Sequence, residues 1–158
     1  MSNHQNTNIS LYAIAMKLMA RRERSETELR QKLIARDFDS CKIDKVIDDL
    51  LSRNLLSDKR FAEAYTKSRS RKGYGPVRIK NELNQRGVND DIVQICLANE
   101  ADQWESRAFS ARRKKFGINL PSEFKEKARQ MRFLEYRGFT TNQINSAFDF
   151  GLSDLEQN

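Results

Sequence analysis

The chain has 158 residues, of which 38% are hydrophobic and 32% are charged, and its formal net charge is +7. Such a composition is lean in apolar residues for one globule of that length, and it suits small helical units with thin cores. The basic charge favours nucleic acid or an acidic protein surface as the partner. Two isolated cysteines and one histidine argue against a zinc site or a disulfide framework, and they indicate a reduced, cytoplasmic protein.

Residues 1–8 are polar, and we expect a flexible tail that lacks the basic-then-apolar pattern of a secretory signal. No apolar run approaches the roughly 18 residues that a membrane span requires. Residues 9–56 are predicted to form a first repeat of three helices. Ser25 and Glu28 form a capping box at the start of its second helix, and its third helix ends near Asn54.

Residues 57–100 are predicted to repeat the same order of three helices. Ser57 is placed to cap the first of them, and the glycine-rich segment 73–76 ends it. Pro76 suits the first turn of the second helix, because a missing N–H costs nothing there. That helix is expected to end at Gly87.

Residues 101–152 form a third and looser repeat, and residues 153–158 are expected to be a second flexible tail. The position that corresponds to Ile79 of the second repeat is Gln130, which is polar. We therefore expect the helical register to slip before Leu134. Terminal repeats are often atypical, because one face lacks a neighbour.

One short phrase marks the end of the second helix in each repeat. It begins at Leu33, Leu83 and Leu134, at intervals of 50 and 51 residues. A buried leucine is followed by an arginine in the last turn, a residue able to adopt the left-handed conformation, and an apolar residue that returns to the core. Asp37 takes the left-handed place that glycine holds in the other two copies. This period predicts an all-α protein of three tandem three-helix, helix-turn-helix-like repeats.

No catalytic constellation is visible, and we expect neither an enzyme nor a cofactor. His4 lies in the N-terminal tail, where it cannot serve as a positioned general base. The acidic residues are spread among oppositely charged neighbours, as on solvated helix faces. Segment 73–76 lacks the glycine-lysine-serine/threonine ending of a phosphate loop and indicates a helix break instead.

The clearest chemical signal is positive charge at the end of the first helix of each repeat. Segment 67–80 holds six Lys and Arg residues and segment 107–115 holds five, and neither contains an acid. Residues 21–24 form a weaker cluster that Glu23 dilutes. A regular stack of repeats should align these clusters in a stripe that contacts phosphates. The candidate contacts are Arg69, Arg71, Lys72, Tyr74, Arg78, Lys80, Arg112, Arg113, Lys114 and Lys115.

Two other interpretations of these residues stay open. Lysine and arginine are also favoured at helix C-termini because of the helix dipole, although that does not account for so many charges. Tyr74 can stack on a base, or it can have a structural role in its loop. We expect the cations at the end of the first helix of the second repeat, Arg69 among them, to be exposed.

A sequence-specific helix-turn-helix reader is the alternative function. It requires a neutral or basic N-terminal face on the third helix of a repeat. The first two repeats begin that helix with acidic residues, and only Thr140–Gln143 in the third has suitable chemistry.

Several motifs together resemble the RecX family, regulators of the bacterial recombinase RecA. Asp37 and Asn54 stand where that family usually has glycine, and both residue types can adopt the left-handed conformation. The motifs that carry the resemblance are Ser25-x-x-Glu28-Leu29-x-x-x-Leu33, Leu55-Leu56-Ser57-Asp58-x-Arg60-Phe61-Ala62, Gly75-Pro76-x-x-Ile79-x-x-Glu82-Leu83 and Arg86-Gly87-Val88.

The resemblance covers roughly residues 10–150 and implies an elongated, curved row of repeats. It further implies a monomer that binds the RecA–DNA filament, and single- and double-stranded DNA without sequence preference. By resemblance, the protein should restrain RecA ATPase, strand exchange and LexA cleavage, in homologous recombination, DNA repair and the SOS response.

Overall fold

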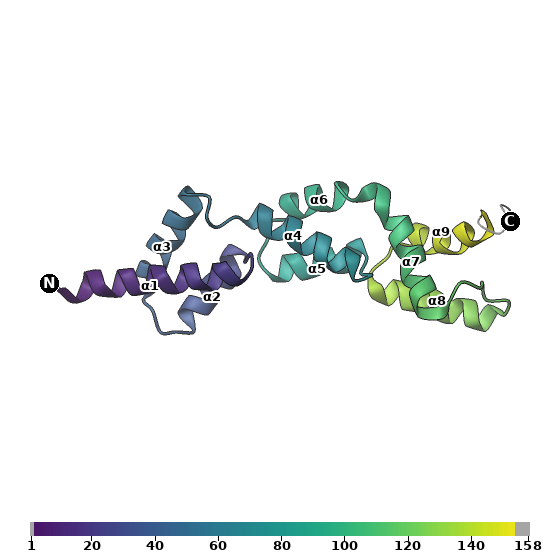
Figure 1. Ribbon diagram of the computed structural model, residues 1–158, viewed down its shortest axis with the longest axis horizontal. Helices are drawn as coiled ribbons and strands as arrows, with labels where there is room; N and C mark the ends of the chain where they lie inside the picture. The colour runs from purple at the N-terminus through teal and green to yellow at the C-terminus, as the bar shows by residue number, and fades with distance from the viewer. Residues whose placement is uncertain (1, 154–158) are drawn as a thin grey trace. The chain divides into compact units, whose positions relative to one another are not determined.

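The computed structural model describes the backbone of residues 2–153 and the side chains of residues 10–149. Over that range the chain forms nine α-helices and one short 3₁₀ helix, with no strand (Figure 1). This confirms the prediction of an all-α fold. The helices are α1 (Ser2–Arg21), α2 (Glu26–Ile34), α3 (Ser40–Ser52), α4 (Asp58–Arg71), α5 (Pro76–Gln85), α6 (Asp90–Ala98), α7 (Trp104–Phe116), α8 (Phe124–Arg137) and α9 (Thr141–Ser153), and the 3₁₀ helix η1 (Ala101–Gln103) precedes α7.

The structure describes most of the tail expected at the N-terminus but little of the tail expected at the C-terminus. Helix α1 begins at Ser2, so its backbone extends through most of the segment 1–8 for which we expect a flexible tail. In the tail expected at 153–158, Ser153 ends α9, and residues 154–158 lie outside the described part of the chain. The repeat boundaries at 9–56, 57–100 and 101–152 stay a prediction. No helix of the described residues has the length and apolar content needed to cross a membrane.

The second helix of each repeat ends as the repeated phrase predicts. Leu33, Leu83 and Leu134 have no exposed surface. In the second and third copies, the N–H of the returning apolar residue donates to the carbonyl of that leucine at 3.2 Å. The left-handed positions are Asp37 (φ 61°), Gly87 (φ 77°) and Gly138 (φ 93°).

The predicted helix starts are also found. The hydroxyl of Ser25 accepts a hydrogen bond from the N–H of Glu28 at 3.1 Å, and the hydroxyl of Ser57 accepts one from the N–H of Arg60 at 3.2 Å. The carboxylate of Glu28 pairs with Arg22 rather than closing the capping box. Pro76 is the first residue of α5.

The chain packs into two compact units, and the second repeat is divided between them. The first unit contains Met1–Ala64 and Leu83–Ile92, and the second contains Tyr65–Glu82 and Val93–Asn158. The core of the first unit is mainly aliphatic and includes Leu11, Ala15, Leu29, Leu33, Ile43, Ile47 and Leu50, each with no exposed surface. Each unit therefore contains a junction between consecutive repeats.

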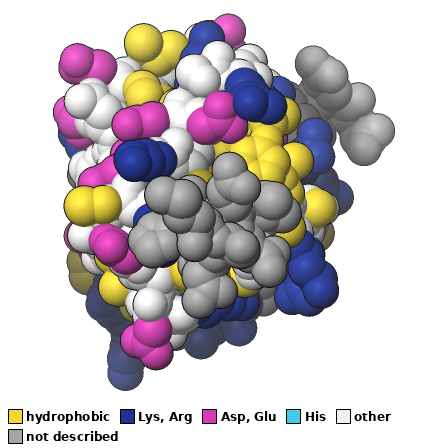
Figure 2. Space-filling view, turned by 90° about the vertical axis from the view of Figure 1, so that its left-hand side faces the viewer, with side chains coloured by type: hydrophobic (Ala, Val, Ile, Leu, Met, Phe, Trp, Pro, Cys, Tyr) yellow, Lys and Arg dark blue, Asp and Glu magenta, His cyan; other side chains and the backbone are white. Residues whose placement is uncertain are grey.

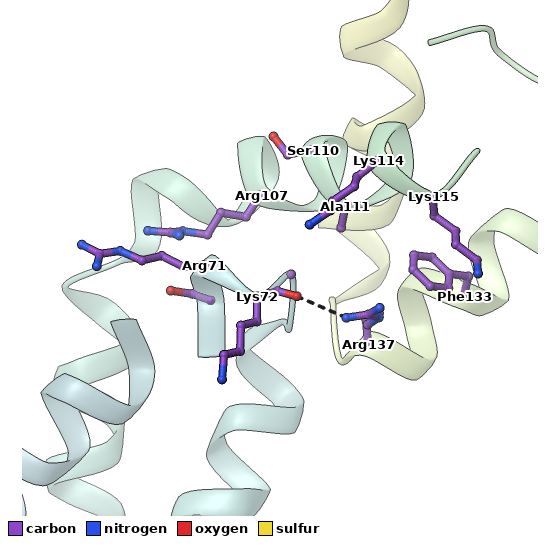
Figure 3. Close-up of a pocket in the computed structure, with 11 residues that line it drawn as sticks. Arg71, Lys72, Arg107, Ser110, Ala111, Lys114, Lys115, Phe133 and Arg137 are labelled. Atoms are coloured by element: carbon purple, nitrogen blue, oxygen red, sulfur yellow. Dashed lines mark hydrogen bonds between the residues drawn. The ribbon is translucent and has the colours of Figure 1, made fainter. Parts of the chain in front are cut away.

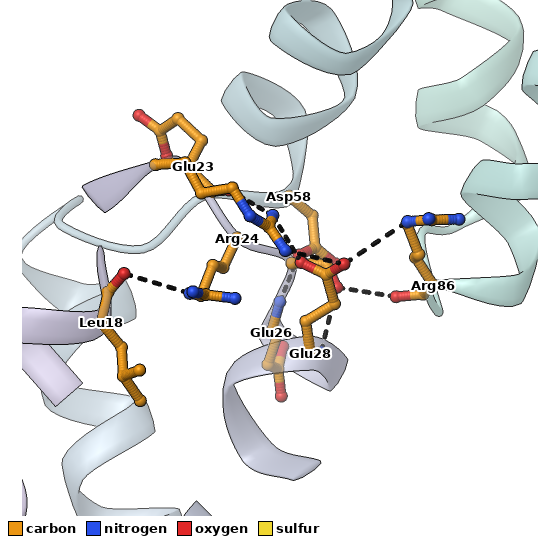
Figure 4. Close-up of polar contacts among 9 residues, drawn as sticks. Leu18, Glu23, Arg24, Glu26, Glu28, Asp58 and Arg86 are labelled. Carbon is orange, nitrogen blue, oxygen red and sulfur yellow. Dashed lines mark hydrogen bonds and ion pairs between the residues drawn. The ribbon is translucent and has the colours of Figure 1, made fainter. Parts of the chain in front are cut away.

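In the first unit, the start of α2 contacts the turn that follows α5 (Figure 4). The hydroxyl of Ser25 donates to the carbonyl of Arg86 at 2.7 Å, and Nε of Arg86 lies 3.4 Å from the carboxylate of Glu28. Gly87 fits closely here, since a Cβ atom on it would lie 2.1 Å from Oγ1 of Thr27. We call this contact the first junction.

The second unit contains the equivalent contact, fifty residues further on. The N–H of Gly75 donates to the carbonyl of Arg137 at 2.8 Å, and the N–H of Val77 donates to that of Gly138 at 2.9 Å. A Cβ atom on Gly75 would lie 2.4 Å from the backbone of Gly138. This second junction joins the start of α5 to the turn between α8 and α9.

The register slip expected before Leu134 is wrong. Gln130 lies in the core of the second unit with 4% of its surface exposed, one helical turn before the buried Leu134. It occupies the place of Ile79 because it has a polar partner. Nη1 of Arg112, whose side chain is fully buried, lies 3.3 Å from Oε1 of Gln130.

Candidate nucleic-acid interface

The second unit contains a pocket of ≈ 480 Å³ that is lined by cations from three helices (Figure 3). Arg71 and Lys72 lie at the end of α4 and Arg137 at the end of α8, while α7 contributes Arg107, Lys114 and Lys115. Ser70, Gly73, Ser110, Ala111 and Phe133 complete the lining, which contains no carboxylate. We call this the basic pocket. It joins the two acid-free segments that the sequence identified.

Two of the six cations are held in place by hydrogen bonds. Nη2 of Arg107 lies 2.9 Å from the carboxylate of Glu100 and also donates to Gln103. Nη1 of Arg137 donates to the carbonyl of Lys72 at 3.2 Å, which links α8 to the end of α4. The other four, Arg71, Lys72, Lys114 and Lys115, are exposed and form no ion pair with any described residue.

The number of charges bears on the two interpretations of these cations. Three helix C-termini border the pocket, and each supplies about −0.5 of an elementary charge. Glu100 offsets Arg107, which leaves five cations against about −1.5 from the helix dipoles. Roughly +3.5 therefore remains without a counter-charge, and the helix-dipole interpretation accounts for less than half of the positive charge.

Arg69 and Arg78 do not line this pocket, because both are held by one carboxylate. Glu82 of α5 accepts from Nε and Nη2 of Arg69 at 2.8 and 2.6 Å, and from Nε of Arg78 at 3.0 Å. The expectation that Arg69 lies at a freely exposed helix end is wrong, since only 20% of its side chain is exposed. These two arginines are fixed parts of the second junction.

The ionisation of Glu82 follows from the same contacts. Burial alone would raise the pKa of Glu82, but the hydrogen bonds from Arg69, from the Tyr65 hydroxyl at 2.7 Å and from Arg78 act more strongly. Together they lower the pKa of Glu82 from 4.5 to about 2. The carboxylate is therefore charged throughout the neutral range and holds both arginines.

Tyr74 is covered by arginines. The guanidinium carbons of Arg69, Arg78 and Arg137 lie 3.8, 4.6 and 4.7 Å from the centre of its ring. Such stacking is a favourable cation–π contact. The structural interpretation of Tyr74 is thus supported by its contacts, since the ring holds the second junction together and orients Arg137.

The remaining predicted contacts lie elsewhere on the second unit. Arg113 is exposed on α7 but does not line the basic pocket, and Lys80 is half-buried on α5. Arg112 cannot contact a phosphate in this structure, because its side chain has no exposed surface. Burial lowers the pKa of Arg112, and the rings of Phe109 and Phe148 lie 5.8 and 5.5 Å from its guanidinium carbon.

The cluster at residues 21–24 belongs to the first unit and is largely paired. Arg22 lies 3.0 Å from Glu28, and Nε of the buried Arg24 donates to the carbonyl of Leu18 at 3.1 Å (Figure 4). The face drawn in Figure 2 has acidic side chains among the basic ones. The concentrated positive charge is therefore a feature of the second and third predicted clusters.

Two pocket residues were missing from the predicted contacts. Arg107 belongs to the acid-free segment 107–115 but is held back by Glu100. Arg137 is the arginine of the repeated phrase. Its place in that phrase predicts only the end of a helix and therefore does not indicate a position at the pocket. The recurrence of that arginine beside a basic cluster was the signal that could have identified it.

The segment Thr140–Gln143, which favours the helix-turn-helix alternative, caps its own helix. The N–H of Thr140 donates to the side chain of Gln143 at 2.9 Å, and the N–H of Gln143 donates to the hydroxyl of Thr140 at 3.4 Å. Both polar side chains are thus engaged at the start of α9. Within the described residues, no group of three His, Cys, Asp or Glu side chains is placed to hold a metal ion.

Tandem three-helix units joined by equivalent junctions, with a basic pocket at one of them, define a helical-repeat protein. Three family models match the chain: the first three-helix domain of RecX at residues 12–50, the second at 57–97 and the third at 102–148. The chain belongs to the RecX family.

Relatives and solved structures agree with this assignment. The regulatory protein RecX of Halorhodospira halophila is 41% identical over 133 residues, covering 84% of this chain and 83% of that protein. The RecX of Serratia proteamaculans is 39% identical over 160 residues, covering 87% of this chain and 95% of that protein. The crystal structure of RecX from Lactobacillus salivarius has the same fold, with a TM-score of 0.78 at 21% identity over 98% of this chain and 99% of that one.

Proposed function

We propose that this protein binds the RecA–DNA filament and inhibits RecA ATPase, strand exchange and LexA cleavage, by binding and not by chemistry. It acts as a monomer in the cytoplasm, in DNA repair, homologous recombination and the SOS response. Membership of the RecX family supports the regulatory role. The basic pocket is the observation that supports contact with the DNA of the filament.

Contact through the basic pocket is independent of sequence. Lysine and arginine side chains that meet phosphates supply affinity and register but carry no information about the bases. The protein therefore binds single- and double-stranded DNA without preference for one sequence. The exposed contacts are Arg71, Lys72, Lys114 and Lys115.

RecA ATPase on single-stranded DNA tests the proposal directly. Adding the purified chain to preformed filaments should slow ATP hydrolysis and strand exchange, while the chain alone should hydrolyse no ATP. Unchanged ATPase and strand exchange at a stoichiometric excess of the chain would rule out the proposed function.

A stand-alone DNA-binding regulator is the rival function, and footprinting distinguishes the two. A filament modulator should protect no preferred sequence on genomic fragments. A reproducible footprint at one site would instead favour the helix-turn-helix alternative, in which the third helix of a repeat reads the major groove.

A further inference from the structure

The two junctions join equivalent positions of the chain but have opposite charge at one of them: Ser25 contacts the carbonyl of Arg86 in the first, and Gly75 contacts that of Arg137 in the second. In the first junction, Glu28 pairs with Arg22 at 3.0 Å and with Arg86 at 3.4 Å. The equivalents of these arginines in the second junction, 50 and 51 residues on, are Lys72 and Arg137. The acid that would neutralise them is replaced, because residue 28 + 50 is Arg78.

This replacement leaves Lys72 and Arg137 of the second junction without a carboxylate partner among the described residues. Arg78 itself is held by Glu82, which does not line the pocket. Arg137 therefore stacks on Tyr74 and donates to the carbonyl of Lys72. In the described part of the chain, equivalent positions thus pair the helix-end arginines with an acid in the first junction and leave Lys72 and Arg137 without one in the second.

We infer that the basic pocket is a phosphate-binding site that the second and third repeats form together, and that the second junction must be closed for it to bind. The inference rests on the proposed function, because it takes the phosphate to come from nucleic acid. Arg71 and Lys72 come from the second matched domain, whereas Arg107, Lys114, Lys115 and Arg137 come from the third.

The chemistry of the lining favours a phosphate chain over an acidic peptide. Arginine forks match phosphate oxygens, and lysines add point charges at variable distance. Phe133 adds an aromatic wall, which a base or sugar can contact. The volume of ≈ 480 Å³ lies within the range of ligand sites, about 300–1,000 Å³, and exceeds what one carboxylate fills.

Closure of the junction brings the mutually repelling cations together, so a bound phosphate should stabilise the closed arrangement. A ligand that binds only the folded form raises its stability with the logarithm of ligand concentration, once that concentration exceeds the dissociation constant. Trp104 is the only tryptophan of the chain and is buried in α7 of the second unit. Its fluorescence therefore reports the unfolding of the unit that contains the pocket.

The experiment is thermal unfolding of the full chain, followed by Trp104 fluorescence at constant ionic strength. Inorganic tripolyphosphate and an oligo-dT strand should each raise the melting temperature, and oligo-dT should displace tripolyphosphate. Lys114→Ala with Lys115→Ala should abolish both increases. The matched control is Arg113→Ala, which removes a cation from the same helix outside the pocket and should keep them.

Two further variants test the junction. Gly75→Ala removes no charge, and its Cβ would lie 2.4 Å from the backbone of Gly138, so it should force the junction apart and abolish the increase with tripolyphosphate. Arg137→Lys also keeps the charge but loses the planar stack on Tyr74, and it should weaken tripolyphosphate binding even if Gly75→Ala does not fold.

Salt dependence supplies a second measurement. Losing Lys114 and Lys115 should lower the salt slope for oligo-dT by about 1.4, at roughly 0.7 per phosphate contact on single strands. An equal decrease of the salt slope in the Arg113→Ala control would show that the net charge of α7, and not the pocket, binds the strand. Full binding by Arg137→Lys and by a folded Gly75→Ala variant would overturn the dependence on the junction.

The source of the anion is decided by competition. Tripolyphosphate binding that oligo-dT does not displace would overturn the assignment to nucleic acid, and equal stabilisation by oligo-glutamate would overturn the assignment to phosphate. None of these measurements involves RecA, so the pocket and the proposed inhibition of the filament can fail separately.

Discussion

Replacing Glu82 with Gln should destabilise the second unit in a way that depends on pH. The carboxylate of Glu82 is 16% exposed and accepts hydrogen bonds from Tyr65, Arg69 and Arg78. Glutamine keeps the shape but removes the charge, so two guanidinium groups lose their counter-ion. A half-buried cation without its partner is costly, which places the effect among the larger ones expected for single substitutions.

The magnitude follows from the pKa of Glu82, which is about 2 in the folded chain against 4.5 for the free side chain. A difference of about 2.5 units corresponds to about 3 kcal/mol of stability at pH 7, at 1.36 kcal/mol per unit. Because the folded pKa is the lower one, this stability is present above about pH 4.5 and disappears as the pH falls towards 2. At pH 3 about 1.5 kcal/mol remains by the same linkage.

Urea unfolding followed by Trp104 fluorescence measures this loss of stability, because Trp104 lies in the second unit together with Glu82. The gap in unfolding free energy between wild type and Glu82→Gln should be about 3 kcal/mol at pH 7 and about half of that at pH 3. Glu126→Gln is the matched control, since Glu126 pairs with Arg129 at an exposed site and its loss should change stability little. A gap of the same size at both pH values would refute an electrostatic role for Glu82.

Two other predictions concern the second unit. Gly138→Ala should lower the melting temperature, because its Cβ would lie 2.4 Å from Cβ of Arg78. An unchanged melting temperature would show that the junction can relax. Gln130→Leu alone should destabilise by about 1–3 kcal/mol by leaving Arg112 without its side-chain partner, whereas Gln130→Leu with Arg112→Met should be neutral or stabilising by about 1–4 kcal/mol. Additive losses in a urea-melt double-mutant cycle would contradict the pairing.

Local signals in the sequence predicted the ends of the helices well. The repeated phrase placed Leu33, Leu83 and Leu134 in the core, and Ser25 and Ser57 at helix starts. Each of these features depends on residues within one turn of one another. Hydrogen bonds and rotamer preferences over that range are set by the neighbouring residues themselves, so one sequence is enough to recognise them.

The partners of charged residues could not be predicted in the same way. Glu82 reaches Arg69 across 13 positions, and Arg112 reaches Gln130 across 18. Periodicity shows which residue faces the core, but not which polar group from another helix will meet it there. A polar residue at a core position of a repeat, such as Gln130, indicates a buried partner rather than a break in register.

The predicted site was correct in its segments and wrong in some of its members for one physical reason. A cation at a helix end can bind a ligand only if no carboxylate of the fold reaches it first. Glu82 reaches Arg69 and Arg78, and burial removes Arg112, whereas Lys114 and Lys115 keep their exposure. The acids at equivalent positions of the other repeats therefore help to predict which cations can bind a ligand, and the number of cations alone does not. By that rule the change from Glu28 to Arg78 is the most informative difference between the first two repeats, because Glu28 pairs with the arginines of the first junction, whereas Arg78 leaves Lys72 and Arg137 without such a partner among the described residues.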